Sequence, residues 1–355
     1  MGLDKLRFKI DEIDEQILAL LNERMQVVAD VGAFKSKTGG AIYRPEREKA
    51  ILERMNSLNS GLLNATAIEA IYLEIFAVSR NLELPEKIAY LGPEGSFTHQ
   101  AAESRFGAMS DYLPMSSIYA VFKALESKRA KYGVVPIENN SDGIVGETLD
   151  LLGESELKIV AELQLPIHQA FVSKAEHLTD IKRVYSKDKA FGQCRDFLVE
   201  HSIESIELIP VESTAKAAKL AAEDATSAAI CSHIAAKLYN IPTLFENIED
   251  IHTNKTRFII LSDFKNSQSE HDKTSILAKL PHKPGSLVQF LQDFDAAEVN
   301  LLKIESRPAR GDEEDFSSWF YIDFEGHFDD KKIQEILSNH ATEVKWLGSF
   351  VNAQG

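Results

Sequence analysis

The chain has little cysteine and little positive charge. Two cysteines in 355 residues, Cys194 and Cys231, form neither a disulfide framework nor a metal-ligand pattern. Lys and Arg number 39 against 55 Asp and Glu, for a net charge of −16, so nucleic acid and anionic membranes are poor partners. No apolar run could span a bilayer, and the first six residues lack the apolar core of a signal peptide. We therefore expect a soluble cytoplasmic protein of two or three domains.

Cofactor-binding motifs are also missing. The loop Gly92–Thr98 follows an expected strand, Ile88–Leu91, and leads into an expected helix from about His99 to Phe106. It has neither the spacing of a phosphate loop nor that of a dinucleotide fingerprint, which argues against ATP and nicotinamide cofactors. His99 and His168 belong to no metal or triad pattern. The sequence thus predicts no cofactor and no metal, and the loop is either a plain capped turn or an anion site.

An apolar seam predicts a long N-terminal helix from about Asp4 to Lys35. Its steps alternate between three and four residues, and its members are Leu3, Leu6, Ile10, Ile13, Ile17, Leu20, Val27 and Val31. Arg24 interrupts the seam. A cation there needs an anionic partner, which is either an internal carboxylate or a ligand.

Two shorter helices follow, one starting at Pro45 and one spanning about Ala65 to Glu83. They are too short to cover the long helix. An overhanging apolar seam is most simply buried against a second copy, so we expect an intertwined homodimer or a higher homo-oligomer.

After a break at Leu84–Lys87, strand and helix signals alternate, which predicts an α/β domain. The expected strands are Tyr132–Pro136, Leu157–Leu165, Arg183–Ser186, Glu207–Pro210 and Ala228–Ile230. Gln164–His168 is a plausible crossing into a second lobe, and Thr243–Ile251 a crossing back. Residues Thr253–Phe258 then place hydroxyls, an amide and two cations at the entrance of the apolar strand Ile259–Leu261. That is either a polar turn or a site.

The polar stretch Lys265–Lys273 marks a linker to a C-terminal unit. That unit has the βαββαβ order of a ferredoxin-like fold. Its expected strands are Ser275–Leu280, Val299–Glu305, Trp319–Phe324 and Val344–Phe350, and its expected helices are Ser286–Ala297 and Lys331–Asn339.

Separated motifs in the same order carry a family resemblance. Tyr90–His99, Val135–Gly143, Tyr185–Cys194 and Thr256–Phe258 together resemble the prephenate dehydratases. Residues 3–83 look like an all-helical chorismate mutase, and residues 274–350 look like an ACT regulatory domain. The chain as a whole resembles the bifunctional chorismate mutase–prephenate dehydratases of phenylalanine biosynthesis. The resemblance implies three domains: a mutase at 1–84, a two-lobed dehydratase similar to periplasmic binding proteins at 87–264, and an ACT domain at 273–355.

By motif position, the resemblance implies a set of mutase site residues: Arg7, Arg24, Lys35, Arg47, Glu48, Ser79 and Glu83. Arg7 would reach the partner subunit's site. The arginines suit the two carboxylates of chorismate, and Lys35 suits the breaking ether oxygen. The alternative for Lys35, Arg47 and Glu48 is a solvated helix end.

Two positions depart from some members of the family, which have Gln at position 83 and Asp near position 44. A Glu83 carboxyl donates to the ether oxygen only when it is protonated, so we expect mutase activity to fall as pH rises. Arg44 leaves the substrate's hydroxyl contact in that region open.

For the dehydratase, the resemblance implies a catalytic set of Asn139, Gln193 and Thr256, with Glu138 beside them, and Ser96 and Thr98 as hydroxyls for an anion. Prephenate loses CO2 and its ring hydroxyl together, so the site needs a donor at the departing oxygen, and Thr256 is suited to donate.

A cationic clamp on the departing carboxylate would favour the ground state. We therefore expect cations at the side-chain carboxylate, with Arg257 as its anchor and Ser213 and Thr214 assisting at a helix start. The alternative is that Arg257 pairs with a structural carboxylate.

In the C-terminal unit, the resemblance implies a phenylalanine site made of Gly285, Ser286, Leu287 and Val288 with Glu305, Ser306, Arg307 and Pro308. Ser286 stands where Ala is usual. The alternative is that this unit binds no ligand and serves only as a dimerisation module. These features favour an enzyme that converts chorismate through prephenate to phenylpyruvate under phenylalanine feedback. The rival is a non-catalytic small-molecule sensor, against which the cation at Arg24 argues.

Overall fold

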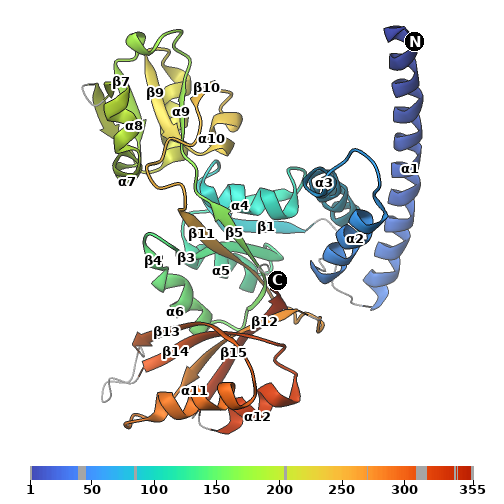
Figure 1. The fold of residues 1–355 in the computed structure, drawn as a ribbon, viewed down its shortest axis with the longest axis vertical. Coiled ribbons are helices and arrows are strands. Elements are labelled where there is room, and N and C mark those ends of the chain that lie inside the picture. Colours follow the sequence, from blue (N-terminus) through green and yellow to red (C-terminus); the bar gives the residue numbers. More distant parts are fainter. Residues whose placement is uncertain are drawn as a thin grey trace. The chain divides into compact units, whose positions relative to one another are not determined.

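The structure is a computed structural model that describes residues 2–38, 45–83, 86–203, 206–269, 271–308, 318–339, 341 and 343–352 (Figure 1). The chain divides into two compact units, Met1–Glu86 with Phe106–Asp111 and Lys87–Arg105 with Tyr112–Gly355. Arg44 and the predicted break at Leu84-Pro85 lie outside the described residues. None of the helices within the described ranges is long and apolar enough to cross a membrane.

The first unit is built on three helices, as the sequence predicts. They are α1 (Leu3–Thr38), α2 (Pro45–Leu58) and α3 (Ala65–Glu83). The predicted seam of α1 is exposed in a single copy of the chain, with Ile10 57% and Leu20 65% exposed. The short helices therefore leave most of the long one uncovered, which is the condition from which the dimer was predicted.

The second unit begins with a lobe built on one sheet, here called the first lobe. Its strands lie in the order β2-β1-β3-β11-β5, with β4 paired to β3. Their bounds are β1 (Lys87–Leu91), β2 (Asp111–Met115), β3 (Tyr132–Asn139), β4 (Gly143–Ile144), β5 (Lys158–Pro166) and β11 (Lys255–Ser262). The helices of this lobe are α4 (Phe97–Phe106), α5 (Ile118–Glu126) and α6 (Gly146–Glu154). Strand β11 lies between β3 and β5 and runs antiparallel to both.

The second lobe has its own sheet in the order β10-β6-β9-β7-β8. The strands are β6 (Ala170–Ser173), β7 (Arg183–Ser186), β8 (Glu207–Pro210), β9 (Ser227–Cys231) and β10 (Thr243–Phe245). The helices are α7 (Asp188–Gln193), α8 (Arg195–Glu200), α9 (Thr214–Glu223) and α10 (His233–Leu238), with the 3-10 turn η1 (Leu178–Asp180). The chain enters this lobe after β5 and leaves it before β11, so the predicted two-lobed arrangement is confirmed.

One boundary of the second lobe was predicted wrongly. The sequence predicts Thr243–Ile251 as the crossing back, but Thr243–Phe245 is the edge strand β10, which pairs with β6. A three-residue strand carries too little alternation to be recognised in a sequence.

The C-terminal part has the predicted βαββαβ order. It consists of β12 (Asp272–Lys279), α11 (Ser286–Ala296), β13 (Leu301–Pro308), β14 (Ser318–Glu325), α12 (Lys331–Asn339) and β15 (Glu343–Val351). The strands form an antiparallel sheet in the order β13-β14-β12-β15, here called the C-terminal sheet. The predicted linker is shorter than expected, because Asp272 and Lys273 are buried in β12.

The C-terminal sheet has a separate core on each face. One face packs against the helices α11 and α12 through residues such as Phe290 and Ile333. The other face shares a core with the first lobe, where Leu277 and Leu347 join Leu149. Strand β15 approaches β5 so closely that a Cβ on Gly348 would lie 2.1 Å from the carbonyl oxygen of Ile159. The two parts are therefore packed backbone to backbone, which explains the glycine.

Candidate functional site

The start of β11 holds a small hydrogen-bonded group of polar side chains. Thr256 is paired in register with Asn139 of β3, and its side chain is buried. The Nδ2 of Asn139 donates to Thr256 Oγ1 at 2.8 Å and to Asn254 Oδ1 at 3.0 Å. The structure therefore brings together two of the three residues that the resemblance implies are catalytic.

The orientation of the Asn139 amide is fixed by its neighbours. Its Oδ1 accepts from the backbone N–H groups of Ser141 at 2.9 Å and Asp142 at 3.1 Å. Because those donors require an acceptor, the amide nitrogen must face Thr256. The Thr256 oxygen thus accepts a hydrogen bond from Asn139, which leaves its own proton available for donation.

Contacts between the lobes bring the other predicted segments toward this group. Lys189 of α7 pairs with Asp142, in the turn that follows Asn139. Gln193 ends α7, and its Oε1 lies 3.5 Å from Nε2 of Gln169. The helix that carries Gln193 is therefore tied to the turn next to Asn139, although the Gln193 side chain comes from the opposite lobe.

The loop Gly92–Thr98, here called the glycine loop, is also joined to the second lobe. Ser232, the N-cap of α10, donates to the carbonyl oxygen of Gly95 at 2.7 Å. Gly95 has φ +83, and a Cβ on it would lie 3.2 Å from Cβ of Ala215, in the first turn of α9. Ser213 caps α9 by accepting from the N–H of Lys216 at 3.1 Å. The loop and the start of α9, which carry the predicted substrate contacts, therefore lie next to each other.

One of those predicted contacts, Ser96, also forms hydrogen bonds within the loop. Ser96 Oγ donates to the carbonyl oxygen of Leu91 and accepts from the N–H of His99. Thr98 is buried in the first turn of α4, and Thr214 begins α9. Each of these hydroxyls lies at or next to a helix N-terminus, where backbone amides favour an anion.

His99 packs behind the loop as a core histidine. It stacks on Tyr90 with ring centroids 4.8 Å apart, and its Nδ1 accepts from the N–H of Gly95. Burial lowers the pKa of His99 below its ordinary value, although Glu103 and Glu94 oppose the change. Burial likewise raises the pKa of Tyr90. Both groups are therefore neutral in the folded protein near neutral pH.

Glu138 and Arg257 lie on the other face of the same two strands. Successive strand residues point to opposite faces, so the residues next to Asn139 and Thr256 turn away from them. Glu138 accepts from Lys303 of β13. The Arg257 guanidinium lies 2.7 Å from Glu162 and 2.7 Å from Asp323. The structure thus corrects the anchoring prediction for Arg257 in favour of its alternative, a structural ion pair, and it does not bring Glu138 together with Thr256.

The two chain crossings between the lobes are joined by a carboxylate that the sequence did not reveal. Glu249 accepts from the N–H of Gln169 at 2.9 Å and pairs with His168 Nδ1 at 2.6 Å. Burial opposes ionisation, yet these hydrogen bonds hold the pKa of Glu249 below its ordinary value. His168 therefore has a structural role, because its pair with Glu249 joins the two chain crossings.

The cysteines are inert in this fold. Cys194 and Cys231 are buried and free. Burial raises the pKa of both thiols, that of Cys231 to about 12. Neither is a thiolate near neutral pH, so nucleophilic cysteine chemistry is excluded here. Among the residues that the structure describes, no three His, Cys, Asp or Glu side chains are grouped to hold a metal ion.

In the helical unit, the predicted mutase residues form two pairs between α1 and α3. Arg24 Nη1 donates to Ser79 Oγ at 2.6 Å. Lys35 Nζ donates to Glu83 Oε2 at 2.7 Å. Arg24 makes no ion pair with a carboxylate within the described part of the chain, so none of the described Glu or Asp residues explains the interruption of the apolar seam.

The remaining mutase predictions are placed differently. Glu48 is buried and pairs with Arg80 of α3, a residue that the sequence did not single out. Arg7 and Arg47 are exposed. The structure of one chain therefore does not bring Arg7 to the two pairs.

The two motifs predicted to bind phenylalanine lie on α11 and β13. Gly285 is the N-cap of α11 in the left-handed region, at φ 85, and Ser286 behind it is buried. Val288 is 59% exposed and Ile304 of β13 is 41% exposed. The motifs therefore lie beside exposed apolar side chains.

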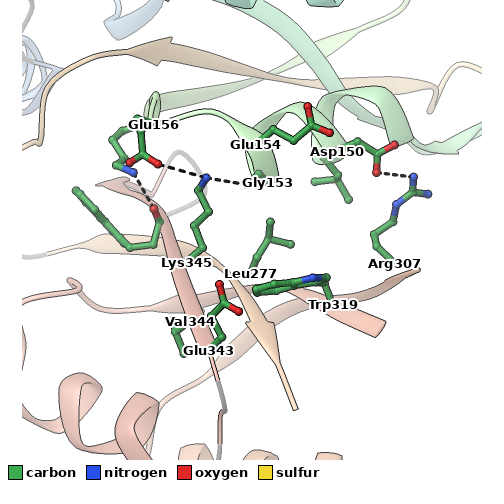
Figure 2. Close-up of a pocket in the computed structure, with 13 residues that line it drawn as sticks. Asp150, Gly153, Glu154, Glu156, Leu277, Arg307, Trp319, Glu343, Val344 and Lys345 are labelled. Atoms are coloured by element: carbon green, nitrogen blue, oxygen red, sulfur yellow. Dashed lines mark hydrogen bonds and ion pairs between the residues drawn. The ribbon is translucent and has the colours of Figure 1, made fainter. Parts of the chain in front are cut away.

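A pocket of about 530 Å³ lies between helix α6 and the C-terminal sheet (Figure 2). Leu277 and Trp319 form part of its wall, and Arg307 crosses its edge to donate to Asp150 at 3.0 Å. Lys345 crosses elsewhere to the carbonyl oxygen of Gly153 at 2.7 Å. Of the predicted phenylalanine residues, Arg307 alone lines this pocket, and none of the predicted dehydratase residues does.

Two known protein families match the chain, one over the helices of the first unit and one over the two lobes. The family described as Chorismate mutase type II matches residues 6–84, and the family described as Prephenate dehydratase matches residues 88–266. The bifunctional chorismate mutase/prephenate dehydratase of Aquifex aeolicus is 40% identical over 99% of this chain and 98% of its own length.

Two solved structures resemble about three quarters of the chain. The prephenate dehydratase of Arthrobacter aurescens in complex with L-Phe matches with a TM-score of 0.67 and 32% identity, over 76% of this chain and 90% of its own. A protein described as a novel type of quorum quenching acylase matches with the same TM-score of 0.67 but 25% identity, over 76% of this chain and 99% of its own. The fold alone therefore does not decide the activity, and the full-length relative and the two matched families do. The chain belongs to the family of bifunctional chorismate mutase/prephenate dehydratases.

Proposed function

We propose that the dehydratase reaction takes place at the Asn139–Thr256 pair, with Gln193 facing it from the second lobe. The observation that carries the proposal is the fixed orientation of the Asn139 amide, which donates to Thr256 and leaves the threonine proton free. A hydroxyl held in this way is a donor aimed in one direction, ready for an oxygen on which negative charge develops.

The enzyme rearranges chorismate to prephenate and then converts prephenate to phenylpyruvate. In the second step, the bond from the ring to the departing carboxylate breaks and its electrons enter the ring. The ring hydroxyl leaves with its bonding electrons as the ring becomes aromatic. In our proposal Thr256 donates its hydrogen bond to that leaving oxygen, where charge develops only in the transition state.

The side-chain carboxylate of prephenate is proposed to bind at the helix N-termini beside the glycine loop. Ser96 and Thr98 lie at the start of α4, and Ser213 and Thr214 lie at the start of α9. The Ser232–Gly95 hydrogen bond joins the loop to the second lobe. Backbone amides and hydroxyls replace Arg257 in this role, because its guanidinium is engaged by Glu162 and Asp323.

The mutase reaction is proposed to take place between α1 and α3. Arg24 and Lys35 project from α1 onto Ser79 and Glu83, which supplies two cations for a dianionic substrate. Arg47 and Glu48 on α2 complete the proposed set. Such a site holds the reactive conformer of chorismate and stabilises charge at its ether oxygen.

A homodimer is part of the mutase proposal. The exposed apolar seam of α1 is suited to a second α1, because both copies would bury the same residues. Arg7 is exposed near one end of α1, and in the dimer it would reach the partner subunit's site. The assembly is proposed to be a dimer or a higher homo-oligomer.

The C-terminal part is proposed to be a ferredoxin-like ACT domain that binds phenylalanine. The site would include Gly285, Ser286, Leu287 and Val288 from one motif and Glu305, Ser306, Arg307 and Pro308 from the other. The Ser286 hydroxyl is buried and has no hydrogen-bond partner among the described residues, which fits a ligand contact. Exposed Val288 and Ile304 support a site shared between two copies. Phenylalanine would then inhibit the dehydratase by favouring one state of the assembly.

The domains are proposed to span 1–84, 87–264 and 273–355, and the enzyme is proposed to be cytoplasmic. The free, buried cysteines support a reducing compartment.

The dehydratase proposal is tested by two substitutions at one position. Thr256→Val removes the hydroxyl while keeping the shape, and we expect kcat for prephenate to fall by about a hundredfold or more. Thr256→Ser keeps a hydroxyl and should retain much more activity than Val. Thr243→Val, an exposed threonine in β10, is the matched control. Full activity in Thr256→Val would contradict the donor role.

A further inference from the structure

Four charged side chains form a buried cluster between the first lobe and the C-terminal sheet. The members of this quartet are Arg257 of β11, Glu162 of β5, Lys273 of β12 and Asp323 of β14. None of them is more than 8% exposed. Two cations meet two anions, so the quartet is neutral as a whole, and each part of the fold supplies one cation and one anion.

Every charge in the quartet is paired across the boundary. Arg257 lies 2.7 Å from Asp323, and Lys273 lies 3.1 Å from Glu162. Ser275 donates to Asp323 as well, at 2.5 Å. Burial opposes ionisation of Asp323, yet Arg257 and Lys273 hold its pKa below the ordinary value. Asp323 therefore meets Arg257 and Lys273 as a carboxylate.

Holding two sheets together does not require such a quartet. Buried ion pairs are costly to desolvate, and well-packed apolar residues of similar size join surfaces equally well or better. The apolar core that the first lobe and the C-terminal sheet share, which includes Leu149 and Leu277, joins the two parts without charges. What charges add is a defined geometry, because each guanidinium and carboxylate fits its partners in one arrangement.

The quartet lies directly behind the proposed catalytic pair. Arg257 follows Thr256 in β11, and Glu138 precedes Asn139 in β3, where the two pairs are in register. Glu138 is held from the C-terminal part too, because it accepts from Lys303 of β13. Both catalytic residues thus have a neighbour whose side chain is bound by the C-terminal part.

We infer that Asp323 and Lys303 are positioning residues for the dehydratase reaction. They hold Arg257 and Glu138, and through these the two strand positions from which Thr256 and Asn139 present their polar groups. The inference rests on the proposed roles of Thr256 and Asn139. It adds that contacts from the C-terminal part position residues of the dehydratase site even when no effector is bound.

The same strand connects this support to the proposed effector site. Lys303 lies two residues before Glu305 on β13, and Arg307, two residues after it, donates to Asp150 of α6 (Figure 2). Residues at this spacing share one face of a strand. A ligand that moves β13 would therefore disturb the contacts to Glu138 and α6 together.

The test is the double variant Asp323→Asn/Lys273→Met in the full-length chain. It removes one anion and one cation, so Arg257 and Glu162 remain as a balanced pair, and Ser275 keeps its acceptor. We expect kcat for prephenate to fall about tenfold, with KM changed by less than about twofold, because a small misplacement of catalytic groups affects turnover more than binding.

A second readout separates positioning from mere stability. Both tryptophans of the chain, Trp319 and Trp346, lie in the C-terminal part, so their fluorescence reports phenylalanine binding and folding there. We expect phenylalanine to alter the fluorescence of the double variant as in the wild type while its effect on kcat is lost or strongly reduced. A merely structural role would not uncouple these two responses.

Two further variants keep the inference falsifiable. Lys345→Met removes another cation that reaches the first lobe, at Gly153, and should leave kcat unchanged. If the double variant does not fold, Lys303→Met replaces it, with an expected several-fold loss of kcat. A folded double variant or Lys303→Met with wild-type kcat and wild-type inhibition would overturn the inference. Thr256→Val, assayed in parallel, shows separately whether the proposed site itself is correct.

Discussion

The first unit leaves apolar side chains of its long helix α1 exposed, whereas the sheet of the first lobe buries charged side chains. In α1 the seam from Leu3 to Val31 faces outward, with Leu3 61% exposed. On the back of β11, Arg257 is 8% exposed and ion-paired. Both arrangements depart from the usual rule of apolar inside and charged outside. The C-terminal sheet covers the charges, and we propose that a second copy of the chain covers the seam.

The largest expected effect comes from breaking the exposed seam. Ile17→Lys places a charge where we propose that two α1 helices meet, and it should dissociate the dimer. Without Arg7 of the partner subunit, mutase activity should fall by about a hundredfold or more. Gln16→Lys adds the same charge at the neighbouring exposed position and is the control. Sedimentation and chorismate turnover give the result, and a dimeric, active Ile17→Lys would contradict the proposed interface.

The second prediction concerns the charge on the seam. Arg24→Leu makes the seam uniformly apolar, so the thermal midpoint of the helical unit should rise. Mutase kcat/KM should fall about a hundredfold, because a forked contact to a substrate carboxylate is lost. Ser79 keeps its hydrogen bond to the carbonyl oxygen of Ile75, so no hydroxyl is left unpaired. An active and destabilised variant would instead make Arg24 a structural residue.

The third prediction concerns the pH dependence of the mutase. Lys35 lies 2.7 Å from Glu83. A carboxyl donates a hydrogen bond to an ether oxygen only in its protonated form, whereas an amide needs no such proton. Glu83→Gln donates at every pH. Its pH–rate profile should be flatter than that of the wild type, with several-fold higher activity at the alkaline end. Identical profiles would remove Glu83 from the donor role.

The smallest effect concerns stability and not activity. Burial lowers the pKa of His99 in the folded state from its ordinary value of 6.5. The unfolded chain therefore binds a proton at a higher pH than the folded one, and stability is lost as pH falls from about 6.5 toward the folded pKa. In His99→Gln, the free energy of unfolding should vary less between pH 7 and pH 5. An unchanged slope, measured by denaturant titration, would contradict this account.

Much of the fold could be predicted because clear sequence signals mark where its helices and strands end. The bounds of α3, α12, β7 and β8 agree with the sequence prediction, since proline, capping residues and polar turns end the apolar patterns there. The edge strand β10 could not be recognised, because three residues hold no period and its pairing with β6 is a tertiary contact.

The proposed catalytic pair could be named from the sequence, but the side chains that surround it could not. Thr256 and Asn139 meet through strand register, which depends on residues 117 positions apart. The direction of the Arg257 side chain could be predicted in part. Successive side chains of a strand point to opposite faces, so Arg257 points away from the face that carries Thr256. Lone acids in apolar strands, Glu162 and Asp323, were a further signal of buried pairing. Which cation each would meet depends on how the C-terminal sheet packs against the first lobe, and no local pattern contains that information.

The most direct measurement follows chorismate consumption and phenylpyruvate formation by the purified chain, with and without phenylalanine. We predict that phenylpyruvate forms from chorismate through prephenate, and that its rate falls when phenylalanine is added. Turnover of prephenate but not of chorismate would contradict the mutase site and leave the helices as a dimerisation element. No turnover of either substrate would contradict both proposed sites and favour a small-molecule sensor.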